Sequence, residues 1–408
     1  MNSTASDWVV ELPAHTPAAA RAVLKLLSRL QVGTLDLQLP TGAQTRFGSG
    51  EGPQASIRLL NWDVCQSALK KGDVGFAEAY FEGHWTTPDL SALLRLLIAN
   101  RTALEEVIYG SWWGSLLGRV RHWLNRNSRS GSRKNIHEHY DLGNAFYRLW
   151  LDDTMNYSSA WFDGRLEQSL AQAQMAKVRR ALQECQVKAG DRVLEIGCGW
   201  GAVAEEATAR IGAQLVGVTL STEQLAFAQE RMLRVACPSS ADLRLQDYRD
   251  VADGPFDAVV SIEMFEAVGR EFWPSYFETV HRQLKPGAKA CIQTITIADD
   301  LFERYVKSTD FIQQYIFPGG MLPSPQVFRE HARRAGLVVE VEMAFGRDYA
   351  ETLRRWRQAF LAQEAQVRAL GFDQRFLRIW EFYLAYCEAA FDTGNTDVMQ
   401  FTLRRPQA

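Results

Sequence analysis

A carboxylate and three alternating glycines stand close together in the stretch VLEIGCGWG, residues 193–201. Glu195 lies two residues before Gly197, and Gly199 and Gly201 follow at every second position. Glycine lets the backbone approach a ligand without a Cβ atom in the way, and a helix that follows offers free N–H groups. Because Glu195 can face the cationic amino group of a methionine moiety, the stretch favours S-adenosylmethionine (SAM) as its ligand.

Two other interpretations of this turn remain open. Gly197, Gly199 and Ala202 also fit the dinucleotide fingerprint, but Thr219 stands where a dinucleotide site needs an acid for its ribose. The remaining alternative is a tight strand–helix turn that binds nothing.

Further polar side chains follow the next two predicted strands. Thr219, Ser221 and Gln224 come after the second strand, and Ser221 with Gln224 also forms a capping box for the next helix. After the third strand, Asp247 can accept a hydrogen bond from an adenine amino group, and Tyr248 can stack on the ring. These residues therefore extend the expected cofactor site.

Two acids follow the fourth predicted strand in the segment SIEMFEAVG, residues 261–269. Glu263 and Glu266 are three residues apart and share a face of a helical turn. A carboxylate pair beside an apolar pocket is a candidate proton acceptor, whereas solvated helix acids are the alternative. Gln293 and Thr294 interrupt the apolar run of the fifth strand with polar side chains.

Strands and helices alternate along this part of the chain, which predicts an α/β domain with a parallel sheet. The predicted strands are 191–196, 214–219, 242–246, 256–261 and 288–297, with helices at 222–235 and 275–284. In such sheets the ligand binds at the carboxyl ends of the strands, where the polar residues above are found.

Residues 1–135 predict a smaller α+β domain without a catalytic constellation of its own. Its last part, residues 111–137, contains Trp112, Trp113 and Trp123 together with several arginines and no acid. This pattern predicts a basic amphipathic linker helix that contacts an anionic membrane surface. The alternative is a helix between domains with a solvated basic face.

The bulk composition narrows the function classes. The 408 residues carry a net charge of −3, which gives no general attraction to nucleic acid. Six scattered cysteines form no CxxC pair, so we expect neither a metal site nor a disulfide framework. No signal peptide and no apolar run of membrane-spanning length is recognised. Together with the cysteine pattern, which favours a reducing compartment, and the basic segment at 111–137, this predicts a cytoplasmic protein associated peripherally with the inner face of the membrane.

Seven motifs, in the same order, resemble the cyclopropane-fatty-acyl-phospholipid synthase family of SAM-dependent methyltransferases. They are HYDLGNAFYRLWLDDTMNYSSAWF, VLEIGCGWG, GVTLS-x-x-Q, LQDYRD, EAVG, FIQQYIFPGG and RDYAETLRRW. The resemblance implies a Rossmann-like class I SAM methyltransferase sheet in residues 136–408, preceded by the smaller domain in 1–135. It implies transfer of a methyl(ene) group to the double bond of a phospholipid acyl chain, with a bound bicarbonate ion removing a proton as a cyclopropane forms.

The resemblance also implies roles by matching position. Glu266 and Tyr349 match the bicarbonate-site glutamate and tyrosine, Ile295 matches a backbone donor, and Tyr140 matches the acyl site. The residues matched to SAM are Tyr157 and Ser158 for the methionine part, Gly197 and Gly199 for the turn, Thr219 and Gln224 for the ribose, and Asp247 and Tyr248 for adenine.

The chain departs from the family at three positions. Ser159 stands where cysteine is common, Gln293 where histidine is common and Glu263 where glycine is common. Serine and glutamine can still donate to an anion but cannot carry the charge of an imidazolium. We therefore expect an altered bicarbonate site in which Glu263 adjusts the polarity.

If proton removal is displaced, the same cation gives a methylene- or methyl-branched chain instead of a ring. A SAM methyltransferase for a soluble small molecule and a catalytically silent lipid-binding protein are the other hypotheses. A homodimer is a further expectation, since two membrane contacts would strengthen binding to a vesicle.

Overall fold

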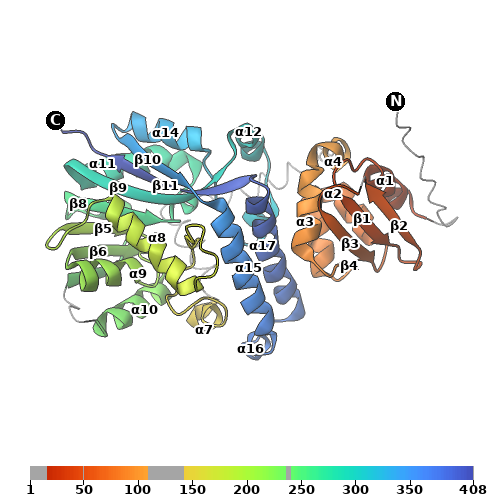
Figure 1. Cartoon of the computed structure of the whole chain (residues 1–408), viewed down its shortest axis with the longest axis horizontal. Helices are drawn as coiled ribbons and strands as arrows, with labels where there is room; N and C mark the ends of the chain where they lie inside the picture. The colour runs from red at the N-terminus through yellow and green to blue at the C-terminus, as the bar shows by residue number, and fades with distance from the viewer. Residues whose placement is uncertain (1–15, 49, 109–141, 236–239, 408) are drawn as a thin grey trace. The chain divides into compact units, whose positions relative to one another are not determined.

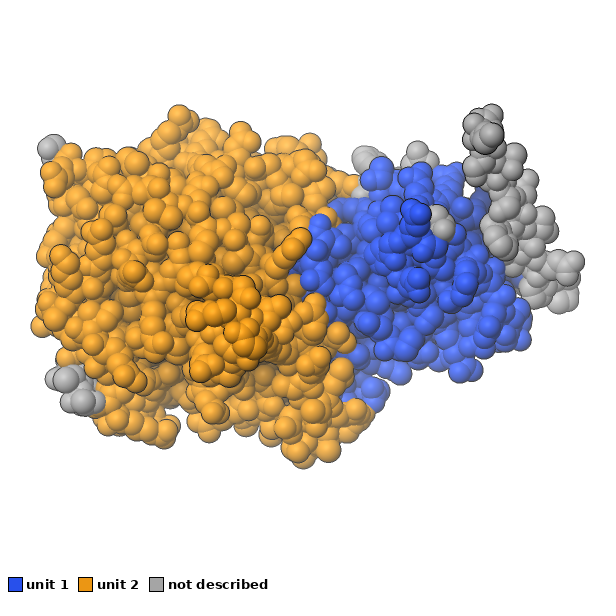
Figure 2. All heavy atoms as spheres, in the orientation of Figure 1, with its two compact units in different colours: residues 1–119, 373–393 blue, residues 120–372, 394–408 orange. Residues whose placement is uncertain are grey.

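The computed structural model describes residues 16–48, 50–108, 142–235 and 240–407. The chain forms two compact units, coloured separately in Figure 2. Unit 1 comprises Met1–Arg119 and Asp373–Thr393, and unit 2 comprises Val120–Phe372 and Gly394–Ala408. Within the described ranges, no helix combines the length and apolar character that a membrane span requires.

Unit 2 is built on a seven-stranded sheet with the order β10-β11-β9-β8-β5-β6-β7 (Figure 1). The strands from β5 to β9 pair in parallel, and β11 runs antiparallel to both β9 and β10. This is the parallel α/β sheet that the sequence predicts, extended by an antiparallel pair at one edge. The strands are β5 (Arg192–Ile196), β6 (Gln214–Thr219), β7 (Ala241–Leu245), β8 (Phe256–Ile262), β9 (Leu284–Ile297), β10 (Val338–Ala344) and β11 (Thr396–Arg404).

Helices cover both faces of this sheet because successive strand residues point to opposite sides. Val193 belongs to one apolar core with α8 and α10, whereas its neighbour Leu194 belongs to the other core with α11 and α14. Burial on both faces explains the continuous apolar runs of the parallel strands. The helices of unit 2 are α7 (Gly143–Tyr147), α8 (Leu170–Glu184), α9 (Ala202–Glu205), α10 (Thr222–Leu233), α11 (Trp273–Gln283), α12 (Asp299–Lys307), α13 (Phe311–Tyr315), α14 (Pro325–Arg334), α15 (Gly346–Ala362) and α16 (Glu364–Ala369).

Unit 1 is a four-stranded sheet with the order β2-β1-β3-β4 and several helices, in agreement with the α+β prediction. A turn at 39–43 joins β1 to β2 in an antiparallel hairpin, and β3 pairs in parallel with β1. The elements are α1 (Ala18–Leu27), β1 (Thr34–Gln38), β2 (Gln44–Gly48), β3 (Gln54–Leu59), α2 (Asp63–Phe81), β4 (Trp85–Thr86), α3 (Leu90–Ala99), α4 (Arg101–Ile108) and α17 (Gln374–Asp392).

Helix α17 joins unit 1 although it comes from near the C-terminus. The Glu388 side chain is only 1% exposed and accepts a hydrogen bond from Ser91 Oγ at 2.8 Å. Arg95 on α3 pairs with Asp392 at 2.8 Å, and the Tyr80 hydroxyl donates to Glu381 at 2.7 Å. The structural division therefore differs from the predicted boundary at residue 135, because long-range contacts place this C-terminal helix with the N-terminal elements. The predicted linker helix at 111–137 lies outside the described residues.

Candidate active site

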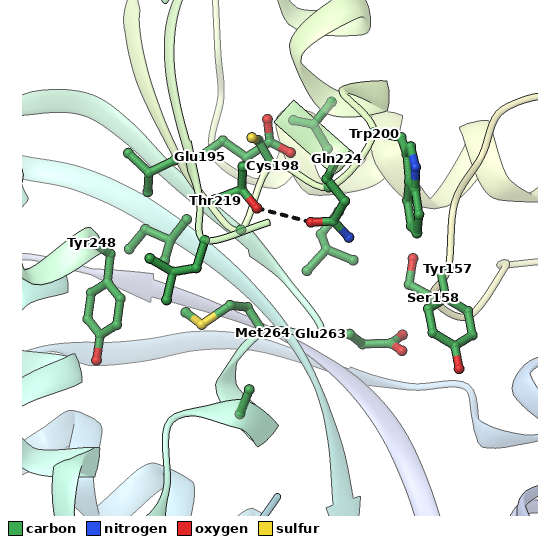
Figure 3. A pocket seen from close by; sticks show the side chains of 18 of the residues that line it. Tyr157, Ser158, Glu195, Cys198, Trp200, Thr219, Gln224, Tyr248, Glu263 and Met264 are labelled. Atoms are coloured by element: carbon green, nitrogen blue, oxygen red, sulfur yellow. Dashed lines mark hydrogen bonds between the residues drawn. The ribbon is translucent and has the colours of Figure 1, made fainter. Parts of the chain in front are cut away.

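A pocket opens at the carboxyl ends of β5, β6 and β8, where the sheet topology predicts a ligand (Figure 3). Most of the predicted cofactor residues line it. These are Tyr157, Ser158, Glu195, Gly197, Gly199, Thr219, Gln224, Asp247 and Tyr248. Glu263 lines the same pocket, so the predicted cofactor residues and one of the predicted acids share a single cavity.

The glycines of the turn after β5 have different tasks. Gly199 has a φ of +50°, and a Cβ atom there would meet nothing within 4 Å, so this backbone faces the open pocket. Gly197 has a φ of +86° and packs against Met264, which would lie 2.9 Å from an added Cβ. Gly201 is absent from the pocket lining; it begins α9 with a φ of +85° and lies close to Ala228. Its role is helix packing rather than the predicted cofactor contact.

Glu195 has the environment expected of a partner for a cation. It is 3% exposed, and its Oε2 atom is buried without a hydrogen-bond partner. Burial raises its pKa well above the ordinary value, opposed by the charge of Arg231. A buried carboxylate that lines a pocket gains from an ammonium group brought in by a ligand. The residue therefore fits the amino group of SAM.

We expect SAM binding to release a proton from Glu195. The raised pKa means that the free site holds a proton at lower pH, and a cationic ligand favours the ionised form. Affinity should therefore rise with pH until the pKa of the free site is passed. Calorimetry in buffers of different ionisation enthalpy should show this release in the wild type. Glu195→Gln should abolish it and weaken binding, whereas the surface control Glu230→Gln should not; equal proton release in both variants would contradict the assignment.

The ribose and adenine side of the pocket agrees with the prediction in part. Thr219 Oγ1 donates to Gln224 Oε1 at 3.0 Å, and both side chains line the pocket (Figure 3). Ser221 does not line it; its hydroxyl accepts from the Gln224 backbone N–H and caps α10. Asp247 lines the pocket while its carboxylate is held by Arg249 at 2.6 Å. Its remaining lone pairs can still accept from an adenine amino group.

Aromatic rings surround the side chain of Tyr157. The Tyr157 ring lies 5.5 Å from Trp150, 5.5 Å from Trp356 and 5.4 Å from Tyr147, measured between ring centroids. Tyr147 in turn contacts Trp200, which lines the pocket, at 5.2 Å. Of these rings only Tyr157 and Trp200 line the pocket, and the buried rings behind them hold the two in place. Aromatic faces attract positive charge, so these two suit a cationic species.

The Glu263 carboxylate is held in a cage of donors. Its Oε1 accepts from the Ser159 backbone N–H at 2.8 Å and from Gln293 Nε2 at 2.7 Å. Its Oε2 accepts from the Tyr349 hydroxyl at 2.7 Å. Figure 3 shows this carboxylate pointing toward the segment of Tyr157 and Ser158. Three of the five residues matched to the bicarbonate site, Ser159, Gln293 and Tyr349, thus donate to a carboxylate of the chain itself.

The backbone at Glu263 explains why glycine suits this position. Its φ of +48° lies in the left-handed region, which costs a non-glycine residue about 1–2 kcal/mol. Three hydrogen bonds to the side chain hold the residue in this conformation. Strain that is maintained by side-chain contacts at a pocket wall points to a functional role for that side chain.

The donors that face Glu263 are themselves fixed. Gln293 Oε1 accepts from Gln400 Nε2 at 2.9 Å, which leaves the Gln293 amide N–H to face Glu263. The hydroxyl of Ser159 does not donate to the anion, contrary to the prediction. The hydroxyl donates to the Ala160 carbonyl at 2.9 Å, and the backbone N–H of Ser159 takes the anion-binding role.

Glu266 lies beside this cage under the loop at 311–324. Its carboxylate accepts from the backbone N–H of Ile295, the residue matched to a backbone donor of the bicarbonate site, and its Oε2 atom is buried without a partner. The Glu266 backbone carbonyl accepts from the Met321 N–H at 2.9 Å, which ties the Pro-Gly-Gly segment to the backbone of this residue. Glu266 is thus enclosed by Ile295 on β9 and by an apolar loop.

The pKa values of both carboxylates are raised, but to different extents. Burial raises the pKa of Glu266 to about 8, and the charge of Glu263 adds to this effect. Burial also raises the pKa of Glu263, but Lys177, Tyr349, Ser159 and Gln293 all oppose that rise. The donors therefore favour the charge on Glu263, and Glu266 holds a proton at neutral pH.

Some site residues were missed by the sequence analysis, and one predicted residue cannot be placed. Trp200 and Met264 line the pocket from within motifs that were recognised for other residues. Lys177 is fully buried behind the site, and its position on the apolar face of a helix was the available signal. Tyr140 lies outside the described residues, so its acyl-site role stays a prediction.

Residues 127–401 match the family model described as Mycolic acid cyclopropane synthetase. The chain belongs to this family. It is 37% identical over 398 residues to Tuberculostearic acid methyltransferase UfaA1 of Mycobacterium tuberculosis, covering 95% of this chain and 92% of that protein. It is 34% identical over 363 residues to the cyclopropane-fatty-acyl-phospholipid synthase of Escherichia coli, covering 88% and 89%.

A solved structure supports the fold and the cofactor. The mycolic acid cyclopropane synthase CmaA1, complexed with SAH and CTAB, superimposes with a TM-score of 0.63 at 33% identity, covering 67% of this chain and 98% of that one. The fold is thus that of a class I SAM methyltransferase. The protein is a SAM-dependent methyltransferase of the cyclopropane synthase family, and SAM is its cofactor.

Proposed function

We propose that the protein transfers a methyl group from SAM to the double bond of an unsaturated phospholipid acyl chain. The observation that carries this proposal is the carboxylate pair, Glu263 and Glu266, placed between the SAM pocket and an apolar loop. An alkene is a weak nucleophile, so it must be held in line with the methyl group in a dry site. Relatives named for acyl-phospholipid and mycolic acid substrates support a lipid.

Bound SAM supplies an electrophilic methyl group. The alkene π electrons would form a new carbon–carbon bond to this methyl group as its bond to the sulfonium sulfur breaks and S-adenosylhomocysteine leaves with that electron pair. A positive charge would remain on the neighbouring acyl carbon, and a proton must then leave. The pocket-lining rings of Tyr157 and Trp200 and the negative charge on Glu263 stabilise this cation. The loop at 311–324 keeps water from adding to it.

We propose that Glu263 accepts this proton, in place of the bicarbonate ion expected from the resemblance. The donors from Ser159, Gln293 and Tyr349 that would hold such an ion already hold the Glu263 carboxylate. A second anion at the same donors would face its charge directly. Glu266, which holds a proton at neutral pH, then serves as the neutral neighbour of the acceptor.

A cyclopropane forms if the proton leaves the incoming methyl group as that carbon bonds to the cationic carbon. A methylene branch forms instead if a hydride first shifts between the two former alkene carbons. The fixed position of Glu263 makes the methylene branch an alternative to the ring. A carboxylate attached to the chain reaches fewer protons of the substrate than a bound ion does. A relative named as a methyltransferase of tuberculostearic acid is consistent with it.

A lipid analysis tests the proposal. A host that expresses the protein, grown with methionine labelled in its methyl group, should incorporate the label into phospholipid acyl chains. Mass spectrometry before and after hydrogenation separates a ring from a methylene branch, and Gly199→Val serves as a matched inactive control. Label confined to small soluble molecules would favour a soluble substrate, and no SAM binding by calorimetry would favour a silent lipid-binding protein.

Contact between the basic, tryptophan-rich segment at 111–137 and an anionic membrane surface is part of the same proposal. Such a surface would bring the protein to its substrate. Flotation with anionic and with neutral vesicles tests this contact. The proposal requires that the protein float with the anionic vesicles, and its absence from them would contradict the proposal.

A further inference from the structure

A lysine lies buried behind the carboxylate pair. Lys177, on α8, is 0% exposed and sits among the buried residues Ala173, Val178 and Ala181 on the inner face of that helix. Lysine is rarely buried completely because its ammonium group loses its hydration. A charge placed in such a position needs compensation from its surroundings.

The structure supplies that compensation from two sides. The Lys177 ammonium donates a hydrogen bond to the hydroxyl of Ser158, which lines the SAM pocket. The next residue, Ser159, donates its backbone N–H to the Glu263 carboxylate at 2.8 Å, so the ammonium and this carboxylate are bound by adjacent residues. Glu263, and after it Asp152, attract the ammonium electrostatically. Asp152 accepts from both the backbone N–H and the hydroxyl of Thr154, which fixes that second carboxylate in place.

These interactions connect Lys177 both to the SAM pocket, through Ser158, and to the Glu263 carboxylate. Burial lowers its pKa to about 8, and the attraction to Glu263 and Asp152 limits the fall, so the group is charged at neutral pH. The same attraction lowers the pKa of Glu263, against the effect of burial. The other charged or titratable groups that act on Glu263 are Glu266 from the turn after β8 and Tyr349 from α15.

We propose that Lys177 is a positioning residue that keeps the Glu263 carboxylate ionised and couples it, through Ser158, to the cofactor pocket. The inference rests on the proposed role of Glu263 as proton acceptor. Lys177 lies outside the pocket lining, yet it sets the charge on Glu263, the proton acceptor. Without this cation, two buried carboxylates would retain their protons to higher pH.

The pH dependence of turnover tests the proposal. Lys177→Met removes the charge at nearly constant length but leaves the Glu263 carboxylate without its cation, which destabilises the fold, so folding is checked by circular dichroism before the kinetics. We expect SAM affinity to change by less than about threefold, while the acid limb of the kcat profile moves to higher pH by about one unit. Turnover near neutral pH should then fall about tenfold and recover at higher pH.

Three comparisons make this result specific. Lys177→Gln should reproduce the shift, Lys177→Arg should leave the acid limb in place because the charge is kept, and the exposed control Lys188→Met should behave as the wild type. Infrared titration of the buried carboxylates should show the same shift without any substrate. If the pH profile of kcat and the infrared titration of Lys177→Met both superimpose on those of the wild type, the role of Lys177 is overturned. If the wild-type protein methylates no acyl chain but the infrared titration still shifts in Lys177→Met, only the proposed function is overturned.

Discussion

Replacing Glu263 with glutamine should lower kcat by about 100-fold or more, because loss of a positioned general base typically costs this much. The fold should survive, since an amide oxygen can accept from Ser159 and Gln293 while the amide N–H₂ donates to the Tyr349 oxygen. SAM affinity should change little, because the charge that faces the cofactor amino group is on Glu195. Turnover with a labelled methyl group, together with calorimetry, measures both quantities.

Glu266→Gln is the matched control for this substitution. Since Glu266 holds a proton at neutral pH, glutamine resembles its resting state and can still accept from the Ile295 N–H. We expect its effect on kcat to be at least tenfold smaller than that of Glu263→Gln. The opposite order would contradict Glu263 as the proton acceptor and would favour Glu266, the residue that matches the bicarbonate-site glutamate of the family.

Gly199→Val should reduce SAM affinity by about 100-fold or more. The Cβ atom of residue 199 projects into the open pocket, so a branched side chain there occupies cofactor space. The backbone, at a φ of +50°, adds strain for a β-branched residue. Calorimetric titration with SAM measures the loss directly.

Gly190→Val separates these two causes. Gly190 also has a positive φ, of +83°, and an added Cβ would meet nothing within 4 Å, but the residue is outside the pocket lining. It should lower thermal stability as Gly199→Val does, while SAM affinity stays near the wild-type value. Comparable loss of affinity in both variants would assign the effect to strain rather than to blockage.

The sequence predicted the sheet and the cofactor pocket because their signals are local. Strands β5, β6 and β8 carry apolar runs that end at glycines or polar residues, and parallel pairing brings those ends together. Glu195 and Gly199 lie within one short motif, so their positions at the pocket could be predicted from spacing alone. Gly201 and Ser221 lie in the same motifs but serve helix packing and capping, which spacing cannot distinguish.

The carboxylate site could be predicted only in part because its contacts are long-range. Glu263 was recognised as unusual, yet its donors come from residues far apart in the chain, and the roles of the Ser159 hydroxyl and backbone depend on local geometry. The sequence of α8 alone does not show that Lys177 is buried, because its burial depends on how the helix packs against the sheet. Helix α17 likewise joins unit 1 through contacts of Glu388 and Glu381 that no local pattern encodes.

The most direct test of a built-in proton acceptor is the turnover of the wild-type protein in buffer depleted of bicarbonate. Purified protein, vesicles of monounsaturated phospholipid and SAM labelled in its methyl group supply every other component. Because Glu263 occupies the anion-binding donors, acyl-chain labelling should proceed at the same rate with and without added bicarbonate. A rate that collapses in the depleted buffer and returns on addition of bicarbonate would contradict the assignment of Glu263.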